Sequence, residues 1–239
     1  MTAIALLGSG EFEPWARPVD KWCAEQVKAS TNRVLVLPTA SAPEGDEVFH
    51  RWGQMGIDHY RAIGLAPEVL ELRERADASK PEIIDAVQGA RLVFFSGGNP
   101  GYLAETLNGT PFWEAVVAAV TKGDTALGGC SAGAAFLGTT APFVAGDSLH
   151  HWTDGTKLLP RAYVMVHFDM LNEFVPGLRD LLLEMRPKDA VAVGIDENTA
   201  LYGDGEHWRV SGTGSVWISA NGNELTPRGD GETLDLRLL

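Results

Sequence analysis

The first half of the chain alternates short runs of apolar residues with longer amphipathic segments. The apolar runs are rich in Val, Leu, Ile and Phe and are bounded by Gly, Pro or Ser, which is typical of buried β-strands. They are Ala3–Leu7, Arg33–Leu37, Glu68–Leu72, Arg91–Phe95 and Thr125–Leu127. Segments with apolar residues at helical spacing lie between them, at Pro18–Ala29, Glu44–Ile63, Pro81–Gln88 and Pro111–Lys122. This alternation predicts an α/β fold with a doubly wound, mostly parallel sheet and flanking helices.

The second half of the chain is less regular. The polar segment Ala141–Lys157 predicts an excursion or hairpin. A strand, a helix and a second buried strand are expected next, at Ala162–Val166, Pro176–Met185 and Ala190–Ile195. Three short alternating segments then lie among turn residues such as Asn221-Gly222, at Thr199–Tyr202, His207–Ser211 and Ser215–Ala220. They predict a closing antiparallel ribbon at the C-terminal end.

Composition and charge narrow the expected partners. No Pro-, Gly- or Ser-rich linker and no block of charge divides the 239 residues, so we expect one domain over residues 1–239. The formal net charge of −13 argues against nucleic acid, because phosphates are bound by clustered Lys and Arg. No apolar run approaches the roughly 18 residues that span a bilayer, and the N-terminus lacks the pattern of a signal peptide. We therefore expect a cytoplasmic protein with no membrane partner.

The glycine and cysteine patterns predict no cofactor and no metal. Gly8-Ser9-Gly10 follows the first strand as a dinucleotide-binding loop would, but Glu13 stands where the third glycine is needed. Cys23 and Cys130 have no metal-ligand spacing and are expected to be unpaired thiols.

The segment Gly129-Cys130-Ser131-Ala132-Gly133 joins an apolar strand to a helix of small residues. A G-x-S-x-G turn in this context places the serine oxygen at the carboxyl end of a parallel strand, where open α/β sheets bind ligands. Glycines flank the serine because side chains there would clash at a strained turn. The backbone N–H of Ala132, at the helix N-terminus, is placed to stabilise an oxyanion. We therefore assign Ser131 as the nucleophile of a serine hydrolase.

Cys130 is the competing nucleophile in this turn. Its flanks would be Gly128 and Ala132, which form a poorer turn than the flanks of Ser131. The residue before a nucleophile also tends to point away from the crevice. We expect Cys130 to be a small buried thiol.

A nucleophilic serine needs a base. Among the six histidines, His167 is the leading candidate because it ends an apolar strand and should lie at the crevice. His150 and His151 stay open as alternatives, since a flexible flap could carry either one over the site. His50, His59 and His207 lie in segments that favour other positions.

The base in turn needs a carboxylate that orients it. Asp196 and Glu197 follow the buried strand at Ala190–Ile195, and spacing alone does not choose between them or exclude a turn that caps the next residues. Asp147 and Asp169 are weaker candidates.

A second Gly-rich turn, Phe94-Phe95-Ser96-Gly97-Gly98-Asn99-Pro100-Gly101, follows another buried strand. Its backbone amides are candidates for the other oxyanion donor, with Gly98 the leading one. The same pattern is common in ordinary strand-to-helix turns, and the two roles are compatible.

Four segments carry a family resemblance. They are FFSGGNP, GGCSAGAAFLG, KLLPRAYVMVHFD and VAVGIDENTALYG, in this order between Phe94 and Gly203. Together they resemble the serine peptidase family of cyanophycinase and dipeptidase E (aspartyl dipeptidase). The resemblance implies a fold like that of class I glutamine amidotransferases. It also implies the Ser-His-Glu triad Ser131, His167 and Glu197, with oxyanion amides from Gly98 and Ala132.

The departures from the family concern the substrate. Cyanophycinases resemble one another in an arginine-rich stretch after the histidine and in a glutamine where Asn99-Pro100 stands here. This chain continues as HFDMLNEFVPGLRD, in which Arg179 is the only arginine. Dipeptidase E holds an aspartyl carboxylate with basic residues beyond its histidine, a role for which Arg179 or Arg161 is a candidate. The substrate-binding residues that we expect are Asn99, Asp169, Arg179 and Arg161.

The sequence therefore predicts a peptidase that acts on small peptides, with aspartyl dipeptides as one candidate class, and a homodimer as a candidate assembly. Two alternatives stay open. One is a glutamine-amidotransferase-like hydrolase that uses Cys130, and the other is a catalytically silent scaffold that binds a small ligand.

Overall fold

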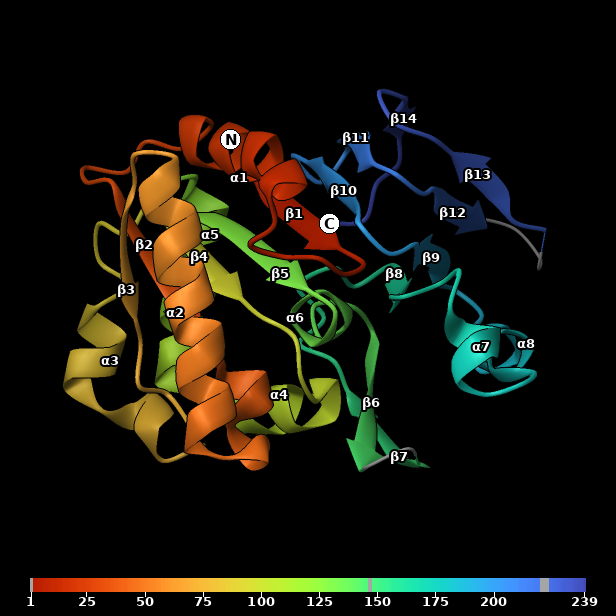
Figure 1. Ribbon diagram of the computed structural model, residues 1–239, viewed down its shortest axis with the longest axis horizontal. Coiled ribbons are helices and arrows are strands. Elements are labelled where there is room, and N and C mark those ends of the chain that lie inside the picture. Colours follow the sequence, from red (N-terminus) through yellow and green to blue (C-terminus); the bar gives the residue numbers. More distant parts are fainter. Residues whose placement is uncertain (1, 146–147, 220–223) are drawn as a thin grey trace.

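The computed structural model describes residues 2–145, 148–219 and 224–239. Within these ranges a large central sheet has helices on both faces (Figure 1). Its parallel strands are β1 (Ile4–Leu7), β2 (Arg33–Leu37), β3 (Ala66–Val69), β4 (Leu92–Phe95) and β5 (Ala126–Cys130). Its antiparallel strands are β10 (Thr199–Gly203), β11 (His207–Gly212) and β14 (Thr233–Asp235). The order is β14-β11-β10-β1-β5-β4-β2-β3, which confirms the predicted mostly parallel α/β fold.

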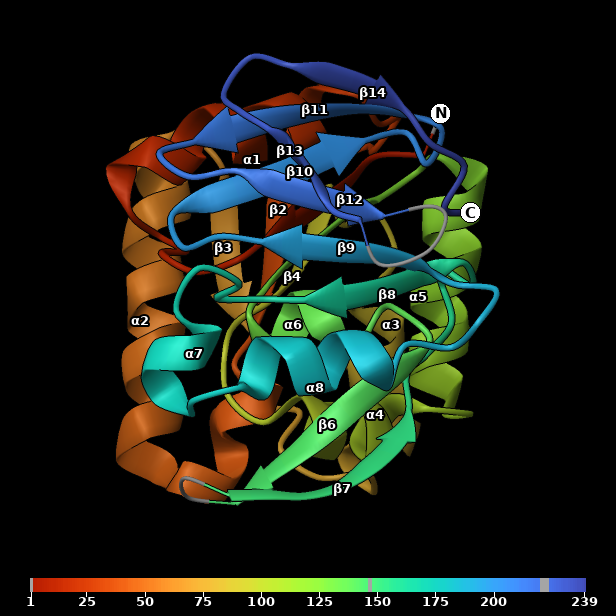
Figure 2. The same ribbon diagram turned by 90° about the vertical axis from the view of Figure 1, so that its right-hand side faces the viewer.

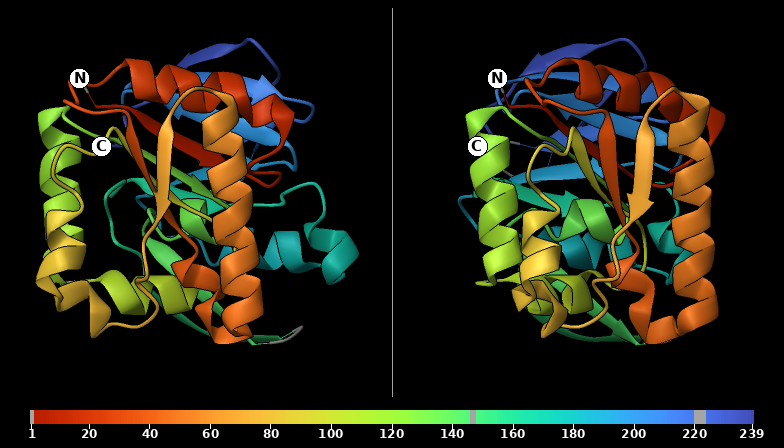
Figure 3. Two further views of the ribbon diagram at one scale, coloured as in Figure 1. Left: turned by 60° about the vertical axis from the view of Figure 1, so that its left-hand side comes forward. Right: turned by 90° about the vertical axis from the view of Figure 1, so that its left-hand side faces the viewer.

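The helices cover both faces of this sheet. One face carries α1 (Arg17–Glu25) and α2 (Asp46–Ala62), and the other carries α3 (Pro81–Asp85), α4 (Pro100–Leu107) and α5 (Pro111–Lys122). Figure 3 shows α2 and α5 on opposite sides of the strands. Because both faces are covered, neighbouring residues of β1 enter different cores. Leu7 belongs to the same buried cluster as Tyr60 of α2, and Leu6 to the same cluster as Phe112 of α5.

A second sheet lies beside the central one and was not predicted from the sequence. It contains β8 (Ala162–Met165), β9 (Val191–Ile195), β12 (Val216–Ser219) and β13 (Thr226–Arg228), in the order β13-β12-β9-β8. Strands β8 and β9 are parallel. The expected C-terminal ribbon is therefore divided, because β10 and β11 join the central sheet and β12 joins the second one.

Shorter elements lie on the β8 side of the second sheet, below β8 in the view of Figure 2. They are α6 (Ala132–Ala135), the hairpin strands β6 (Thr140–Ala145) and β7 (Ser148–Asp154), and the helices α7 (Leu171–Phe174) and α8 (Leu178–Glu184). The hairpin agrees with the excursion expected at Ala141–Lys157. Short 3-10 helices lie at Pro14–Ala16, Thr39–Glu44 and Asp77–Ser79. No helix within the described ranges has both the length and the apolar character needed to cross a bilayer.

Several element boundaries differ from those expected. Strand β3 begins at Ala66 rather than Glu68, because the edge strand follows its ladder with β2, where Ala66 pairs with Arg33. Helix α4 was not predicted, since its sequence begins with Pro and Gly. It begins at Pro100 after Asn99, whose Oδ1 accepts a hydrogen bond from the Tyr102 N–H (3.0 Å). The helix expected at Pro176–Met185 begins at Leu178, after Gly177 in a left-handed conformation.

Candidate active site

Ser131 lies on a sharp turn between β5 and α6. Its backbone has φ of 51° and ψ of −112°, a region that residues with a side chain rarely adopt. A Cβ on Gly129 would collide with the Gly133 carbonyl, and a Cβ on Gly133 would collide with the carbonyl of Phe95. The two flanking glycines are therefore required for the turn that the sequence predicts.

A continuous chain of hydrogen bonds joins Ser131, His167 and Glu197. The Ser131 Oγ lies 2.8 Å from the His167 Nε2, and the His167 Nδ1 lies 3.0 Å from the Glu197 Oε1. The side chains of His167 and Glu197 are 26% and 36% exposed, so the chain of bonds opens to solvent at one side. This arrangement can carry a proton from the serine hydroxyl to the imidazole.

The two sheets position this chain of bonds together. Ser131 follows β5 of the central sheet, whereas His167 and Glu197 follow β8 and β9 of the second sheet. Because β8 and β9 are parallel neighbours, their carboxyl ends meet at one edge. The Phe168 N–H donates to the Ile195 carbonyl (3.0 Å) and closes that edge. His167 has φ of 50°, a second left-handed residue at the site.

Two further contacts fix the segment that carries Glu197. The Asp169 Oδ1 accepts a hydrogen bond from the Glu197 N–H (2.9 Å), and the Ser9 Oγ accepts one from the Asn198 N–H (3.0 Å). Asp169 thus contacts the backbone of the acidic residue instead of the imidazole. The second bond ties the end of β9 to the segment after β1.

The two residues predicted to supply oxyanion amides are Gly98, in the turn after β4, and Ala132, directly after Ser131. Gly98 has φ of 138°, and a Cβ there would collide with the backbone of Ala40, so only glycine fits. The Asn99 N–H donates to the Ala40 carbonyl (2.8 Å) and fixes this turn. Neither the Gly98 N–H nor the Ala132 N–H has a hydrogen-bond partner among the described residues. Both residues line the same pocket as Ser131.

Glu11 is a residue of this site that the sequence analysis missed. Its side chain is buried, and its Oε1 accepts a hydrogen bond from the Gly97 N–H (2.8 Å). A Cβ built on Gly97 would lie 3.5 Å from the Ser131 Cβ, so the Glu11 contact fixes the chain directly against the serine. A carboxylate one residue after the Gly-rich end of β1 was the available signal. That signal alone does not reveal the contact, because the partner of Glu11 lies 86 positions away in the sequence.

Cys130, the competing nucleophile, precedes Ser131 in the same turn and is buried. Its side chain is completely buried in the cluster that faces α1 and α2. Burial raises the pKa of the Cys130 thiol well above its usual range, and the nearby Glu11 carboxylate adds to the shift. A buried, protonated thiol is a poor nucleophile.

Among the described residues, the alternative acids and bases do not join the chain of hydrogen bonds. Asp196 is buried and accepts bonds from the Ser215 N–H (2.9 Å) and the Trp217 indole N–H (3.0 Å). Burial raises the pKa of the Asp196 carboxyl. The exposed His151 ring lies 3.3 Å from Glu105. Asp147 lies outside the described residues, as does the side chain of His150.

Neither candidate arginine is among the residues that line the pocket around Ser131. Arg161 precedes β8 and His167 follows it, and this four-residue strand spans about 13 Å. Arg179 is exposed on α8, with its guanidinium carbon 5.9 Å from the centre of the Phe168 ring. Asn99 lies next to Gly98, where its side chain caps α4.

Within the ranges that the structure describes, no cluster of three or more His, Cys, Asp or Glu side chains is arranged to hold a metal ion.

Comparison with known proteins identifies the family. A model of peptidase family S51 matches residues 4–211. A cyanophycinase of Trichormus variabilis is 28% identical over 235 residues, which cover 94% of this chain and 75% of that protein. A cyanophycinase of Synechococcus elongatus is 33% identical over 191 residues, which cover 77% of this chain and 57% of that protein.

Solved structures agree with this family. The crystal structure of a peptidase from an acI-B1 Actinobacterium superposes with a TM-score of 0.86 and 32% identity, over 99% of this chain and 97% of that one. A peptidase E candidate from Listeria monocytogenes has a TM-score of 0.61 and 17% identity, over 89% of this chain and 99% of that one, which shows a shared fold. The chain therefore belongs to peptidase family S51 and is a serine-type peptidase.

Proposed function

We propose that this peptidase hydrolyses small peptides through an acyl-enzyme formed on Ser131. The observation that carries the proposal is the unbroken chain of hydrogen bonds from the Ser131 Oγ through His167 to Glu197. In this proposal His167 is the general base and Glu197 orients its ring. Asp169 is a positioning residue, because it holds the backbone of Glu197.

The reaction proceeds in two halves. The Ser131 Oγ attacks the peptide carbonyl carbon while its proton passes to the His167 Nε2. The amides of Gly98 and Ala132 donate to the oxyanion of the tetrahedral intermediate. His167 then gives the proton to the leaving amine as the C–N bond breaks. In the second half, water attacks the acyl-enzyme with His167 again as base, and the acid product leaves Ser131 free.

This chemistry uses only groups of the protein and water. The aspartyl dipeptides implied by the family resemblance would place a second carboxylate in the site. Neither Arg161 nor Arg179 lines the pocket around Ser131, so the proposal does not include that preference.

Hydrolysis of a dipeptide library by the wild type and by Ser131→Ala tests the proposal. The wild type should cleave a subset of the peptides. Ser131→Ala should lose about 10⁶-fold in kcat, since the members of such a triad act as a unit. Retained hydrolysis in a folded Ser131→Ala variant would contradict the assignment.

A further inference from the structure

A cavity of about 180 Å³ opens directly beside the serine. Its lining includes Gly98, Ser131, Ala132 and His167, so it is continuous with the reacting groups and both oxyanion amides. Whatever fills this cavity therefore lies next to the bond that is cleaved.

The walls of the cavity come from three parts of the second-sheet region. Strand β8 contributes Tyr163 and Val164, the α7–α8 pair contributes Leu171 and Leu182, and the β6–β7 hairpin contributes Trp152. Figure 2 shows these three parts gathered on one side of the molecule. The Trp152 and Tyr163 rings pack together with their centres 6.2 Å apart, which makes one wall a continuous aromatic surface.

Apart from His167, no side chain with a formal charge lines the cavity among the described residues. The Tyr163 hydroxyl is buried without a hydrogen-bond partner in the same ranges, and burial raises the pKa of its phenol well above its usual range. A carboxylate or guanidinium placed here would lose its hydration and gain no counter-charge, at a large cost in free energy. An apolar side chain would gain by leaving water.

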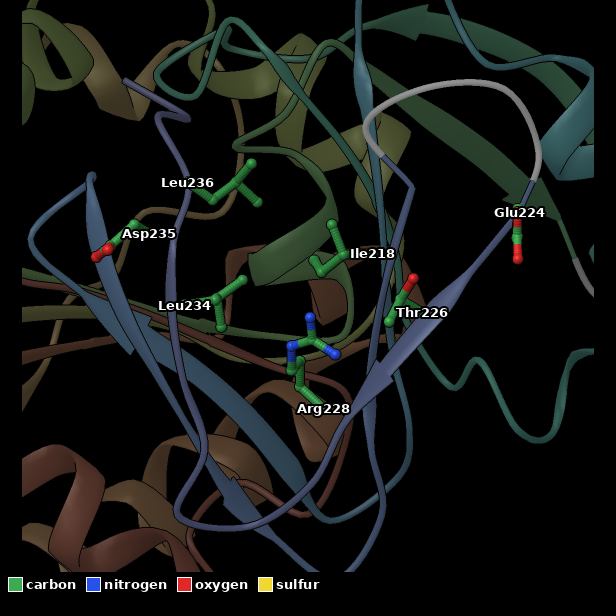
Figure 4. Close-up of a pocket in the computed structure, with 7 residues that line it drawn as sticks. All are labelled: Ile218, Glu224, Thr226, Arg228, Leu234, Asp235 and Leu236. Carbon is green, nitrogen blue, oxygen red and sulfur yellow. The ribbon is translucent and has the colours of Figure 1, made fainter.

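Another hollow, of about 390 Å³, differs from this cavity because charged side chains line it. It lies between β13 and the segment that carries Leu234 and Leu236, with Arg228, Glu224 and Asp235 among its lining residues (Figure 4). It contains charged groups but none of the residues around Ser131, so it does not supply a subsite for the reaction.

We propose that the cavity beside Ser131 binds a large apolar side chain of the residue next to the scissile bond. The enzyme then selects small peptides with Leu, Phe or Met at that position, over peptides with Asp or Arg. This inference rests on the proposed function, because it assumes that Ser131 attacks the peptide bond.

The test compares kcat/KM for matched dipeptides in which one residue varies at a time. The set contains Leu-Ala, Phe-Ala, Asp-Ala and Ala-Ala, the reversed pairs, and β-Asp-Arg. At one of the two positions Leu should exceed Ala by about tenfold or more. Asp should fall below Leu by about a hundredfold, since an unpaired carboxylate must be desolvated.

Two variants each add a positive charge to the lining of the cavity, and a third variant serves as the control. Leu178→Arg and Phe174→Arg each place a cation on the lining. Phe174 is already 57% exposed, so this change does not threaten folding. Both variants should raise the ratio of Asp to Leu hydrolysis by about tenfold, because the cation supplies the missing counter-charge. Leu181→Arg, on α8 like Leu178 but 50% exposed and outside the lining, should leave the ratio unchanged.

Labelling of Ser131 by a fluorophosphonate separates the two proposals. If Ser131 is labelled and the wild type cleaves Asp or Arg peptides in preference to Leu peptides, the apolar subsite is wrong and the proposed function stands. A ratio that moves equally in the Leu181→Arg control would also overturn the subsite. If Ser131 is not labelled and no dipeptide is cleaved, both proposals fail.

Discussion

The Glu11 carboxylate accepts a hydrogen bond from the Gly97 N–H at 2.8 Å, across 86 positions of the sequence. The bond links the segment after β1 to the turn after β4, one residue before the amide that we propose for the oxyanion. Both segments follow parallel strands of the central sheet. The two residues therefore meet because of the strand order, although they are distant in the sequence.

Replacing Glu11 should therefore affect the transition state more than substrate binding. Loss of one oxyanion donor costs about 10²–10³ in kcat, and Glu11→Ala only loosens the turn that holds Gly98. We expect kcat to fall by about 10- to 100-fold with little change in KM. Glu11→Gln keeps an oxygen acceptor and should retain most of the activity. Steady-state kinetics on both variants test this, and equal kcat for folded Glu11→Ala and wild type would refute it.

Asp169 should matter through Glu197. Asp169→Ala removes the acceptor of the Glu197 N–H, so the acid that orients His167 becomes less fixed. We expect kcat/KM to fall by about tenfold, consistent with the loss of a charged hydrogen-bond partner. Asp169→Asn, which keeps an acceptor oxygen, should restore most of it. Asp180→Ala, at an exposed position of α8, is the control and should match the wild type.

Cys130 should be dispensable and unreactive. Because burial raises the pKa of its thiol, the fraction of thiolate stays low at neutral pH and rises only at strongly alkaline pH. Iodoacetamide at pH 7 should leave peptidase activity intact, and Cys130→Ala should keep activity within a few fold of the wild type. Inactivation by iodoacetamide that Cys130→Ala abolishes would instead support the thiol nucleophile.

The turn around Ser131 should tolerate no side chain at Gly133. Gly133→Ala brings a Cβ into the Phe95 carbonyl, and overpacking of this kind costs about 1–3 kcal/mol in the free energy of unfolding. Activity should fall with it, because Ser131 must shift. Gly109→Ala is the matched comparison. Its φ of 68° is strained for alanine, but nothing lies within 4 Å of the new Cβ. Urea unfolding and peptidase assays of both variants test the difference, and wild-type behaviour of Gly133→Ala would argue against the tight turn.

Much of the central sheet could be predicted from the sequence because its strands are buried on both faces. Such strands appear as continuous apolar runs, and β1, β2, β4 and β5 lie within or close to the expected ranges. The second sheet could not be predicted in the same way. The runs that became β8, β9 and β12 predict strands, but their local pattern does not say which sheet each one joins.

In the candidate site, too, some residues could be predicted from the sequence and others could not. Ser131 and His167 could be selected because each follows an apolar strand at a carboxyl end. The choice between Asp196 and Glu197 could not be made from spacing alone. In the structure the Asp196 carboxylate contacts Trp217 and the Glu197 carboxylate contacts His167, as successive side chains at a strand end point to opposite sides. Glu11 was missed because its partner is distant in sequence.

The measurement that tests the central claim most directly is covalent labelling by a fluorophosphonate, followed by mass spectrometry of the modified peptide. Wild-type enzyme should carry the adduct on Ser131. His167→Ala should label at least about 10³-fold more slowly, because the serine has lost its base. Labelling of Ser131 at the same rate in the two proteins, or an adduct at a different residue, would contradict a serine activated by His167.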